Sequence, residues 1–395
     1  MKIAAPIETR IFRGFGELDA KQWDRLPLDG FYASSPWLES VEGALSPHSG
    51  FVVAEAADGR AVGGLVAYPV ATGAFVYLDA LGLMLGESGI AILEPYFSAE
   101  QLRRVAKLVA ALAPLVAGAR PTATAVIPFG YSSAWAHGGS SQVARRLLDG
   151  FHELHREWGA RSSAFLYVDE SDAVTRGCLE ERGYVSTVIE ARALLPVRFG
   201  DFGGYLASLG SNRRHQIRKE LRAIEGLELE TTLVDGSELH EWMDELAPLA
   251  ADLMAKHGNP RDVERERDSF RRIQRSLARF ARVAVVRRQG RAVCFALFYE
   301  ADGALHVSFS GNDYSTPRAH FLAAYYAPLE HALRRGAVLL DYGMGAHETK
   351  VNRGCQLSLQ RGFLDLGGEG ASEVKELMQL VEAAQRRRFA RSVGP

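Results

Sequence analysis

The stretch Val338–Phe363, VLLDYGMGAHETKVNRGCQLSLQRGF, runs from an apolar strand into a loop of ionisable side chains. The residues Val338 to Leu340 predict the strand, and the glycines Gly343 and Gly345 break it. The polar side chains that follow within a few residues are Tyr342, His347, Glu348, Lys350 and Arg353. Proteins that combine helices with a sheet often build their sites where a buried strand ends in such a loop. Lys350, its one amine, is therefore the first catalytic candidate.

Length and composition limit the class of protein. The 395 residues exceed the ~250–300 at which single cores stop growing, so we expect more than one domain. A hydrophobic content of 47% and a net charge of -2 are typical of a globular protein and argue against a nucleic-acid wrapper. Three cysteines without paired spacing predict neither disulfides nor a zinc site. No apolar run approaches the ~20 residues of a membrane span, and we expect a cytoplasmic protein.

An internal repeat organises the chain. The segment DGRAVGGLVAY at residues 58–68 matches QGRAVCFALFY at residues 289–299, with an offset of 231 positions. Each begins at a turn between expected strands, Phe51–Ala56 and Ala61–Pro69 in the first half, Arg282–Val286 and Ala292–Glu300 in the second. We expect a third meander strand in each half. These third strands are Ala74–Ala80 and Ala304–Ser310.

A helix and a strand repeat downstream of the meanders. The helix Ala144–Trp158 precedes the strand Ser163–Val168, and the helix His320–Arg335 precedes the strand Val338–Leu340, with an offset of 177 positions. The first half therefore holds about 54 extra residues between meander and helix, partly filled by a helix at Ser98–Leu112. Internal duplication explains the order, and chance similarity of two α/β halves is the alternative. Ala193–Gly204 is the expected linker, and Glu373–Arg388 the last helix.

Three segments of the second half stand out: the basic helix SNRRHQIRKELR at Ser211–Arg222, the helix and strand at Tyr325–Gly345, and Lys350 followed by Arg353-Gly354. These three segments resemble the Fem-type (FemABX) aminoacyl transferases of the GNAT acyltransferase superfamily. The resemblance implies an α/β (α+β) fold of two tandem GNAT-like domains, 1–195 and 196–370, with a C-terminal helix at 371–395. It also implies aminoacyl transfer to an amine, with Arg214 facing a substrate phosphate and Lys350 steadying the transition state.

One departure concerns the acyl donor. GNAT enzymes that use coenzyme A carry an Arg/Gln-x-x-Gly-x-Gly/Ala loop before the main helix, and the second half has GNDYSTPRAH there. The first half offers HGGSSQVARRLL at His137–Leu148, which is out of register. The usual pyrophosphate cradle is therefore missing or rebuilt, which favours a donor other than acyl-CoA.

The helix Ser211–Arg222 places arginines at i, i+4 and i+8 beside an apolar face. With Ser211 as its N-cap, Arg213 and Arg214 stand in the first turn, where a helix favours anions. We expect Arg213, Arg214 and Arg218 to bind phosphate or tRNA. The alternative is a solvated basic face answered by Glu220 and Glu225.

The candidate catalytic residues are Lys350, Asp313 and Tyr342. A fixed ammonium at Lys350 would stabilise the tetrahedral oxyanion of acyl transfer, and the alternative is a surface lysine paired with Glu348. Asp313 would accept the proton of the attacking amine, although Asn312-Asp313 before Pro317 also fits an ordinary turn. Tyr342 would shape the acceptor pocket.

Further substrate-binding candidates are His257, Tyr314, His347 and Arg353. Lys256-His257-Gly258 before Pro260 also reads as a helix stop. His152 and His155 lack partners for a metal site, and Cys355 lacks a partner for nucleophilic catalysis. We expect no metal.

The sequence therefore predicts an amide-forming N-acyltransferase without a tightly bound cofactor. Its donor is aminoacyl-tRNA, bound through the tRNA acceptor end, or acyl-CoA, as in an acyl-CoA-dependent N-acetyltransferase. Its acceptor is a small-molecule or peptide amine in peptidoglycan or natural-product biosynthesis. A non-catalytic binding protein with a degenerate GNAT pair is the alternative of another class. The sequence does not identify the acceptor or the oligomeric state.

Overall fold

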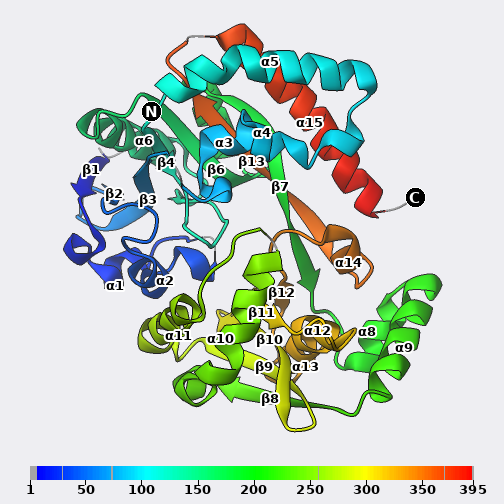
Figure 1. Cartoon of the computed structure of the whole chain (residues 1–395). Helices are drawn as coiled ribbons and strands as arrows, with labels where there is room; N and C mark the ends of the chain where they lie inside the picture. Colours follow the sequence, from blue (N-terminus) through cyan, green and yellow to red (C-terminus); the bar gives the residue numbers. More distant parts are fainter. Residues whose placement is uncertain (1–6, 29, 73, 257, 369, 394–395) are drawn as a thin grey trace. The chain divides into compact units, whose positions relative to one another are not determined.

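The computed structural model describes residues 7–393 except positions 29, 73, 257 and 369. It divides into two compact units (Figure 1). Unit 1 holds the described residues up to Ala191 and from Ser358 onward, and unit 2 is Arg192–Leu357. The chain leaves unit 1 within the strand β7 (Val185–Pro196) and returns within β13 (Gln356–Asp365).

These units differ from the expected division at 195 and 370, because the residues from Ser358 onward pack within unit 1. The segment of β13 from Ser358 onward pairs antiparallel with β6 (Ser162–Asp169). The last helix, α15 (Ala371–Val393), packs against α5 (Ala99–Gly118) through a buried face that includes Leu377, Met378 and Val381. The apolar stripe of the last helix thus finds its partner inside unit 1.

The sheet of unit 1 has the strand order β1-β2-β3-β4-β6-β13-β7, with β5 paired to β3. Its pairs are antiparallel between β1, β2, β3 and β4, and parallel between β4 and β6. The strands not yet given are β1 (Glu8–Phe12), β2 (Gly50–Glu55), β3 (Ala61–Val70), β4 (Thr122–Ala125) and β5 (Trp135–Ala136).

Helices with apolar residues on one face cover this sheet. In α6 (Ser141–Glu157), Ser140 caps the amide of Val143, and the helix buries Leu147, Phe151 and Leu154. The capping box expected at Ser98 and Gln101 is present at the start of α5. The other helices of unit 1 are α1 (Ala20–Trp23), α2 (Ser35–Ser40), α3 (Ala80–Met84), α4 (Glu87–Ala91) and α7 (Ala173–Glu181). Its short 3-10 turns are η1 (Phe15–Glu17), η2 (Phe31–Ala33), η3 (Val76–Leu78) and η4 (Glu94–Tyr96).

The third strand expected at Ala74–Ala80 is wrong. Its described residues form η3 and the start of α3, because the Asp79 side chain accepts from the amide of Gly82 and caps a helix there. The third strand of this meander is instead β4, which follows α5 and pairs with β3. The extra residues of the first half therefore lie between β3 and β4.

Unit 2 repeats this layout, with the strand order β8-β9-β10-β11-β12-β7. The pair β11–β12 is parallel, and the pairs β8–β9, β9–β10, β10–β11 and β12–β7 are antiparallel. The glycine turns before and after β10 have positive φ at both residues, Gln289-Gly290 and Asp302-Gly303, as two-residue hairpins of type I′ require. The strands are β8 (Leu229–Asp235), β9 (Ala281–Arg288), β10 (Arg291–Ala301), β11 (Ala304–Asn312) and β12 (Leu339–Asp341).

Helices lie on both faces of the unit 2 sheet (Figure 1). One face packs on α8 (Phe202–Ser208), α9 (Ser211–Glu225), α12 (Ala319–Phe321), the π-helix η6 (Leu322–Tyr326) and α13 (Ala327–Arg335). The other face contacts α10 (Leu239–Lys256) and α11 (Val263–Leu277), with η5 (Gly236–Glu238) before α10. The expected linker Ala193–Gly204 shrinks to 197–201, because β7 extends to Pro196 and α8 begins at Phe202.

The fold agrees with the expected α/β class and includes the expected C-terminal helix. Among the described residues, no helix is both long and apolar enough to cross a membrane.

The packing of α10 on β11 depends on Gly311. A methyl group at this position would lie 2.3 Å from Phe295 Cε1 and 2.7 Å from the backbone nitrogen of Ala250. We predict that Gly311→Ala lowers the free energy of unfolding by about 1–3 kcal/mol, because overpacking forces the helix away from the sheet. Thermal unfolding of the full chain measures this. Gly177→Ala on α7, where a methyl group meets no atom within 4 Å, is the control and should be neutral or stabilising. Equal transitions for Gly311→Ala and the natural chain would contradict the close contact.

Candidate functional site

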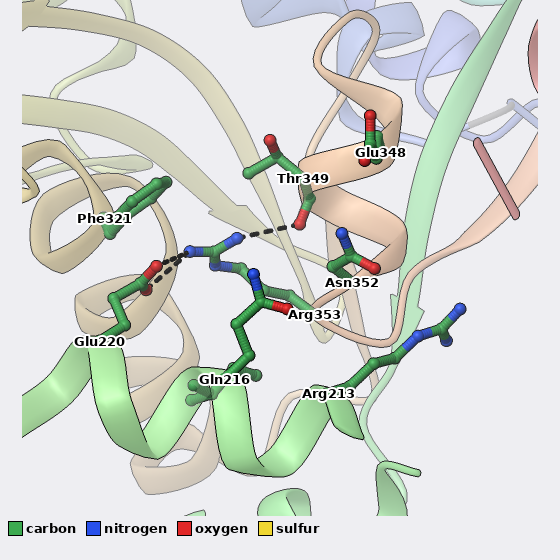
Figure 2. Close-up of a pocket in the computed structure, with 9 residues that line it drawn as sticks. Arg213, Gln216, Glu220, Phe321, Glu348, Thr349, Asn352 and Arg353 are labelled. Carbon is green, nitrogen blue, oxygen red and sulfur yellow. Dashed lines mark hydrogen bonds and ion pairs between the residues drawn. The ribbon is translucent and has the colours of Figure 1, made fainter. Parts of the chain in front are cut away.

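A cavity of about 310 Å³ lies between α9 and the short helix α14 (His347–Val351) in unit 2 (Figure 2). The helix α9 supplies Arg213, Gln216, Ile217 and Glu220 to its wall. The segment around α14 supplies Glu348, Thr349, Asn352 and Arg353, and Phe321 completes the lining. Two of the predicted site residues, Arg213 and Arg353, therefore meet at one cavity although 140 positions separate them in the sequence.

The helix α9 begins one residue earlier than the sequence suggested. Gly210, rather than Ser211, is its N-cap, and the carbonyl of Gly210 accepts from the amide of Arg214 at 3.0 Å. No side chain caps this end. Arg213 and Arg214 still stand in the first turn, and the buried residues Ile217 and Ile224 hold the helix on the core. The positive end of the helix dipole is thus crowded with guanidinium groups, which favours an anion there.

Arg353 is buried and connects α14 to α9. Its Nη2 donates to both carboxylate oxygens of Glu220, at 2.6 and 2.8 Å, and its Nη1 donates to the carbonyl of Thr349 at 3.0 Å. The rings of Phe321 and Tyr325 lie 4.2 and 4.6 Å from its Cζ. The carboxylate of Glu220 therefore pairs with Arg353, a residue outside its own helix.

The π-helix η6 adds another partner for Glu220. Tyr326 of η6 donates its hydroxyl to Glu220. Burial, and then the Glu220 carboxylate, raise the pKa of the Tyr326 phenol, so the phenol stays a donor. Together Glu220, Arg353 and the aromatic side chains Phe321, Tyr325 and Tyr326 form the arginine box.

Lys350 holds the loop that precedes α14. Its side chain is buried, and Nζ donates to the carbonyls of Tyr342 and Met344 at 2.6 Å and to that of Gly343 at 3.2 Å. The alternative of a surface lysine paired with Glu348 is therefore wrong, because the ammonium lies inside the fold. The expected role of Lys350 at an oxyanion stays a prediction.

A second charged group, absent from the sequence-based candidates, fixes the same loop. The Oδ2 of Asp341 lies 2.6 Å from Arg192 Nη2 and 3.4 Å from His306 Nδ1, and its Oδ1 accepts from the amide of Gly343 at 2.8 Å. Burial alone would raise the pKa of Asp341, but Arg192 and then His306 hold it well below its usual range. The register that pairs His306 with Asp341 brings these residues together, and only the strand pairing reveals it.

The other predicted catalytic residues have partners of their own. Asp313 Oδ1 accepts from the amide of Ser315 at 2.8 Å, and this bond lowers the pKa of Asp313, as in an ordinary turn. The hydroxyl of Tyr342 donates to the carbonyl of Tyr325 at 3.0 Å, and burial raises its pKa well above 10. Neither residue is among those that line the described cavity. Their catalytic roles stay predictions.

The remaining predicted binding residues lie in different surroundings. Tyr314 is 44% exposed, and Lys256 Nζ lies 3.3 Å from the centre of its ring. His347 is buried at the start of α14, and Arg218 is exposed on α9. His257 lies outside the described residues. The helix stop before it is present, since α10 ends at Lys256 and Gly258 has a φ of 74°.

A groove of about 600 Å³ lies beside the cavity, along the neighbouring face of α9. Asn212, His215 and Lys219 of α9 line it together with Arg318, and it shares Glu220 and Gln216 with the cavity. Apart from Glu220, its charged groups are cationic. The sequence-based candidates did not include His215, Lys219 or Arg318.

Metal and thiol chemistry find no support in the described part of the chain. No group of three or more possible ligands from His, Cys, Asp and Glu is present among the described residues. His152 hydrogen-bonds to the Tyr184 hydroxyl at 3.2 Å. Burial raises the pKa of Cys355 to about 12, which keeps the thiol protonated.

Comparisons with known proteins agree with the fold. The family model FemAB-like, described as peptidoglycan biosynthesis/recognition, matches residues 129–365, more than half of the chain. The crystal structure of FemX is similar over 90% of this chain and 96% of its own, with a TM-score of 0.57 and 11% sequence identity. A tandem GNAT protein from the clavulanic acid biosynthesis pathway, without AcCoA, is similar over 91% and 98%, with a TM-score of 0.53 and 12% identity. At the level of sequence, no curated protein matches. These likenesses confirm the tandem GNAT-like fold.

The charges around Asp341 predict how stability depends on pH. Because its folded pKa is depressed, Asp341 stabilises unit 2 above the unfolded value of about 3.9, and this contribution is lost as the pH falls below that value. We predict that Asp341→Asn lowers the free energy of unfolding by about 3–5 kcal/mol at pH 7, because Arg192 and His306 lose their carboxylate.

Urea unfolding between pH 7 and pH 3 measures this difference. The difference between Asp341→Asn and the natural chain should stay constant down to about pH 4 and then shrink. Asp302→Asn, in an exposed hairpin turn, is the control and should change stability by less than about 0.5 kcal/mol. A difference that grows toward acid would contradict the depressed pKa.

Proposed function

Because the chain belongs to the FemAB-like family of peptidoglycan biosynthesis/recognition proteins, we propose that it is an N-acyltransferase. It transfers an aminoacyl group from aminoacyl-tRNA to the amine of an acceptor and forms an amide bond. A donor of this kind also fits the cytoplasmic location expected from the sequence.

The observation that carries this proposal is that the groove and the cavity lie beside each other along α9. The groove is lined by Lys219, Arg318 and His215 with one carboxylate, Glu220, and suits the phosphates of a donor. The cavity beside it holds two guanidinium groups and two carboxylates, and suits a less charged partner. A transferase must hold a donor and an acceptor side by side, and neighbouring sites of unlike charge meet that need.

The proposed reaction needs few groups from the protein. The neutral amine attacks the ester carbonyl of the aminoacyl-tRNA, the C–N bond forms, and the C–O bond to the ribose breaks. The amine loses a proton, and the ribose oxygen gains one. The protein accelerates this step by orienting both substrates and by stabilising the oxyanion. Lys350, whose Nζ already donates to the carbonyls of residues 342–344, is the proposed fixed positive charge that stabilises the oxyanion through its electric field and not through a hydrogen bond.

The segment before α12 supports tRNA over acyl-CoA as the donor. Residues 313–318, DYSTPR, contain no glycine, and Pro317 has no amide hydrogen to offer a pyrophosphate. Arg318, at the N-cap of α12, has a left-handed φ of 68° and lines the groove instead. A guanidinium there replaces the row of amides that a pyrophosphate cradle requires.

Incubation of the full chain with charged tRNA and a panel of amines tests the activity. We predict a mass increase of the acceptor by one aminoacyl residue, and no such product from acyl-CoA. Lys219→Ala should weaken tRNA binding about tenfold and reduce the slope of affinity against salt by about one, since one phosphate contact is lost.

Lys107→Ala, an exposed lysine on α5, is the matched control and should leave tRNA binding unchanged. Products formed from acyl-CoA but not from charged tRNA would show that acyl-CoA is the donor. The absence of any product with both donors would favour a non-catalytic binding protein and reject the transferase.

A further inference from the structure

The ring of Tyr314 in unit 2 is exposed, and the proposed transfer step does not use it. Tyr314 is 44% exposed and is the most exposed aromatic side chain among the described residues. Single exposed apolar residues are common on protein surfaces, so exposure alone gives the ring no function. Two further features distinguish Tyr314, namely the fixed turn that carries it and the charges around it.

The turn that carries Tyr314 is held on both sides of this residue. The amide of Asp313 donates to the carbonyl of Val293 at 2.7 Å, and the Asp313 carboxylate accepts from the amide of Ser315 at 2.8 Å. Thr316, which follows, is buried. The backbone on either side of the ring is therefore already ordered. A ligand that stacks on such a ring loses little binding free energy to the ordering of the protein.

A lysine covers one face of the Tyr314 ring. Nζ of Lys256, the last residue of α10, lies 3.3 Å from the centre of the ring. Among the described residues, no second cation and no other aromatic ring lies against Tyr314. The opposite face of the ring can therefore receive a planar group. The ammonium of Lys256, which is itself exposed, lies close enough to attract a negative charge that such a group carries.

Tyr314 and Lys256 lie on the same side of unit 2 as the groove and the cavity. Arg318, which lines the groove, follows Tyr314 by four positions in the segment before α12. The charge of Lys256 also reaches the residues around the cavity. Burial lowers the pKa of His320, and the charges of Arg353 and Lys256 lower it further, so both cations lie near that imidazole.

An exposed ring with cations nearby suits an unpaired nucleotide. Every base has a π-face that stacks on an aromatic side chain, and the phosphates beside the base attract lysine and arginine. The acceptor end of tRNA is single-stranded, so its bases are free to stack. We propose that Tyr314 is the stacking platform for an unpaired base at the 3′ end of the tRNA, with Lys256 and Arg318 facing its phosphates. This inference rests on the proposed function, in which tRNA carries the acyl group.

Binding of uncharged tRNA to the full chain at several salt concentrations tests the platform without any transfer. Tyr314→Ala should weaken binding at least fivefold, about 1 kcal/mol, because one base loses its stack. The slope of affinity against salt should stay unchanged, since no charge is removed. Tyr314→Phe keeps the ring and should bind tRNA as the natural chain does. Both variants should unfold at the same temperature as the natural chain, because the side chain is exposed.

The control ligand is the same tRNA without its unpaired 3′ nucleotides, which should bind the natural chain and Tyr314→Ala equally. The control variant is Leu102→Ala, an exposed apolar residue on α5, which should bind intact tRNA as the natural chain does. Equal binding of intact tRNA to Tyr314→Ala and to the natural chain would reject the platform. A Tyr314→Phe variant as weak as Tyr314→Ala would also reject it, because the hydroxyl and not the ring would then be the contact.

The two proposals fail in different ways. If Tyr314→Ala loses affinity as expected but charged tRNA yields no product, the platform stands and the transferase fails. If charged tRNA yields the product and Tyr314→Ala has the KM of the natural chain for it, the transferase stands and the platform fails.

Discussion

The buried ion pair of Glu220 and Arg353 joins two segments that are 133 positions apart in the sequence. Arg353 Nη2 lies 2.6 and 2.8 Å from the two carboxylate oxygens of Glu220, inside the arginine box. The low dielectric there strengthens the attraction between the two charges. For the same reason, either charge left without the other would cost much free energy. The pair sets the distance between α9 and α14. The cavity, which residues of both helices line, depends on that distance.

Charged side chains also shape the loop before α14, and they do so by binding its backbone. Lys350 donates to three successive carbonyls, and Asp341 accepts from the amide of Gly343. Both therefore order a glycine-rich segment that would otherwise be free to move. Lys350 and Asp341 thus act on the backbone inside the fold, whereas Arg353 and Glu348 line the cavity.

The sequence predicted the elements that local chemistry controls. The hairpin turns at Gly290 and Gly303, the capping box of α5 and the amphipathic helix α6 are all present. The helix near Asp79 was missed, because a side-chain cap overrode an apolar run that reads as a strand. The site was predicted only in part: Arg213 and Arg353 line the cavity, but the roles of Glu220 and Asp341 depend on contacts between distant segments, and no local pattern encodes those contacts.

A double-mutant cycle between Glu220 and Arg353 tests the central claim most directly. The free energies of unfolding of Glu220→Gln, Arg353→Met and the combined variant, measured by urea titration at pH 7, give the coupling energy of the pair. The buried ion pair predicts a coupling of about 2 kcal/mol or more, since each single variant leaves its partner as an unpaired charge in the arginine box. A coupling below about 0.5 kcal/mol, the value of an exposed pair, would contradict the claim that this interaction organises the site.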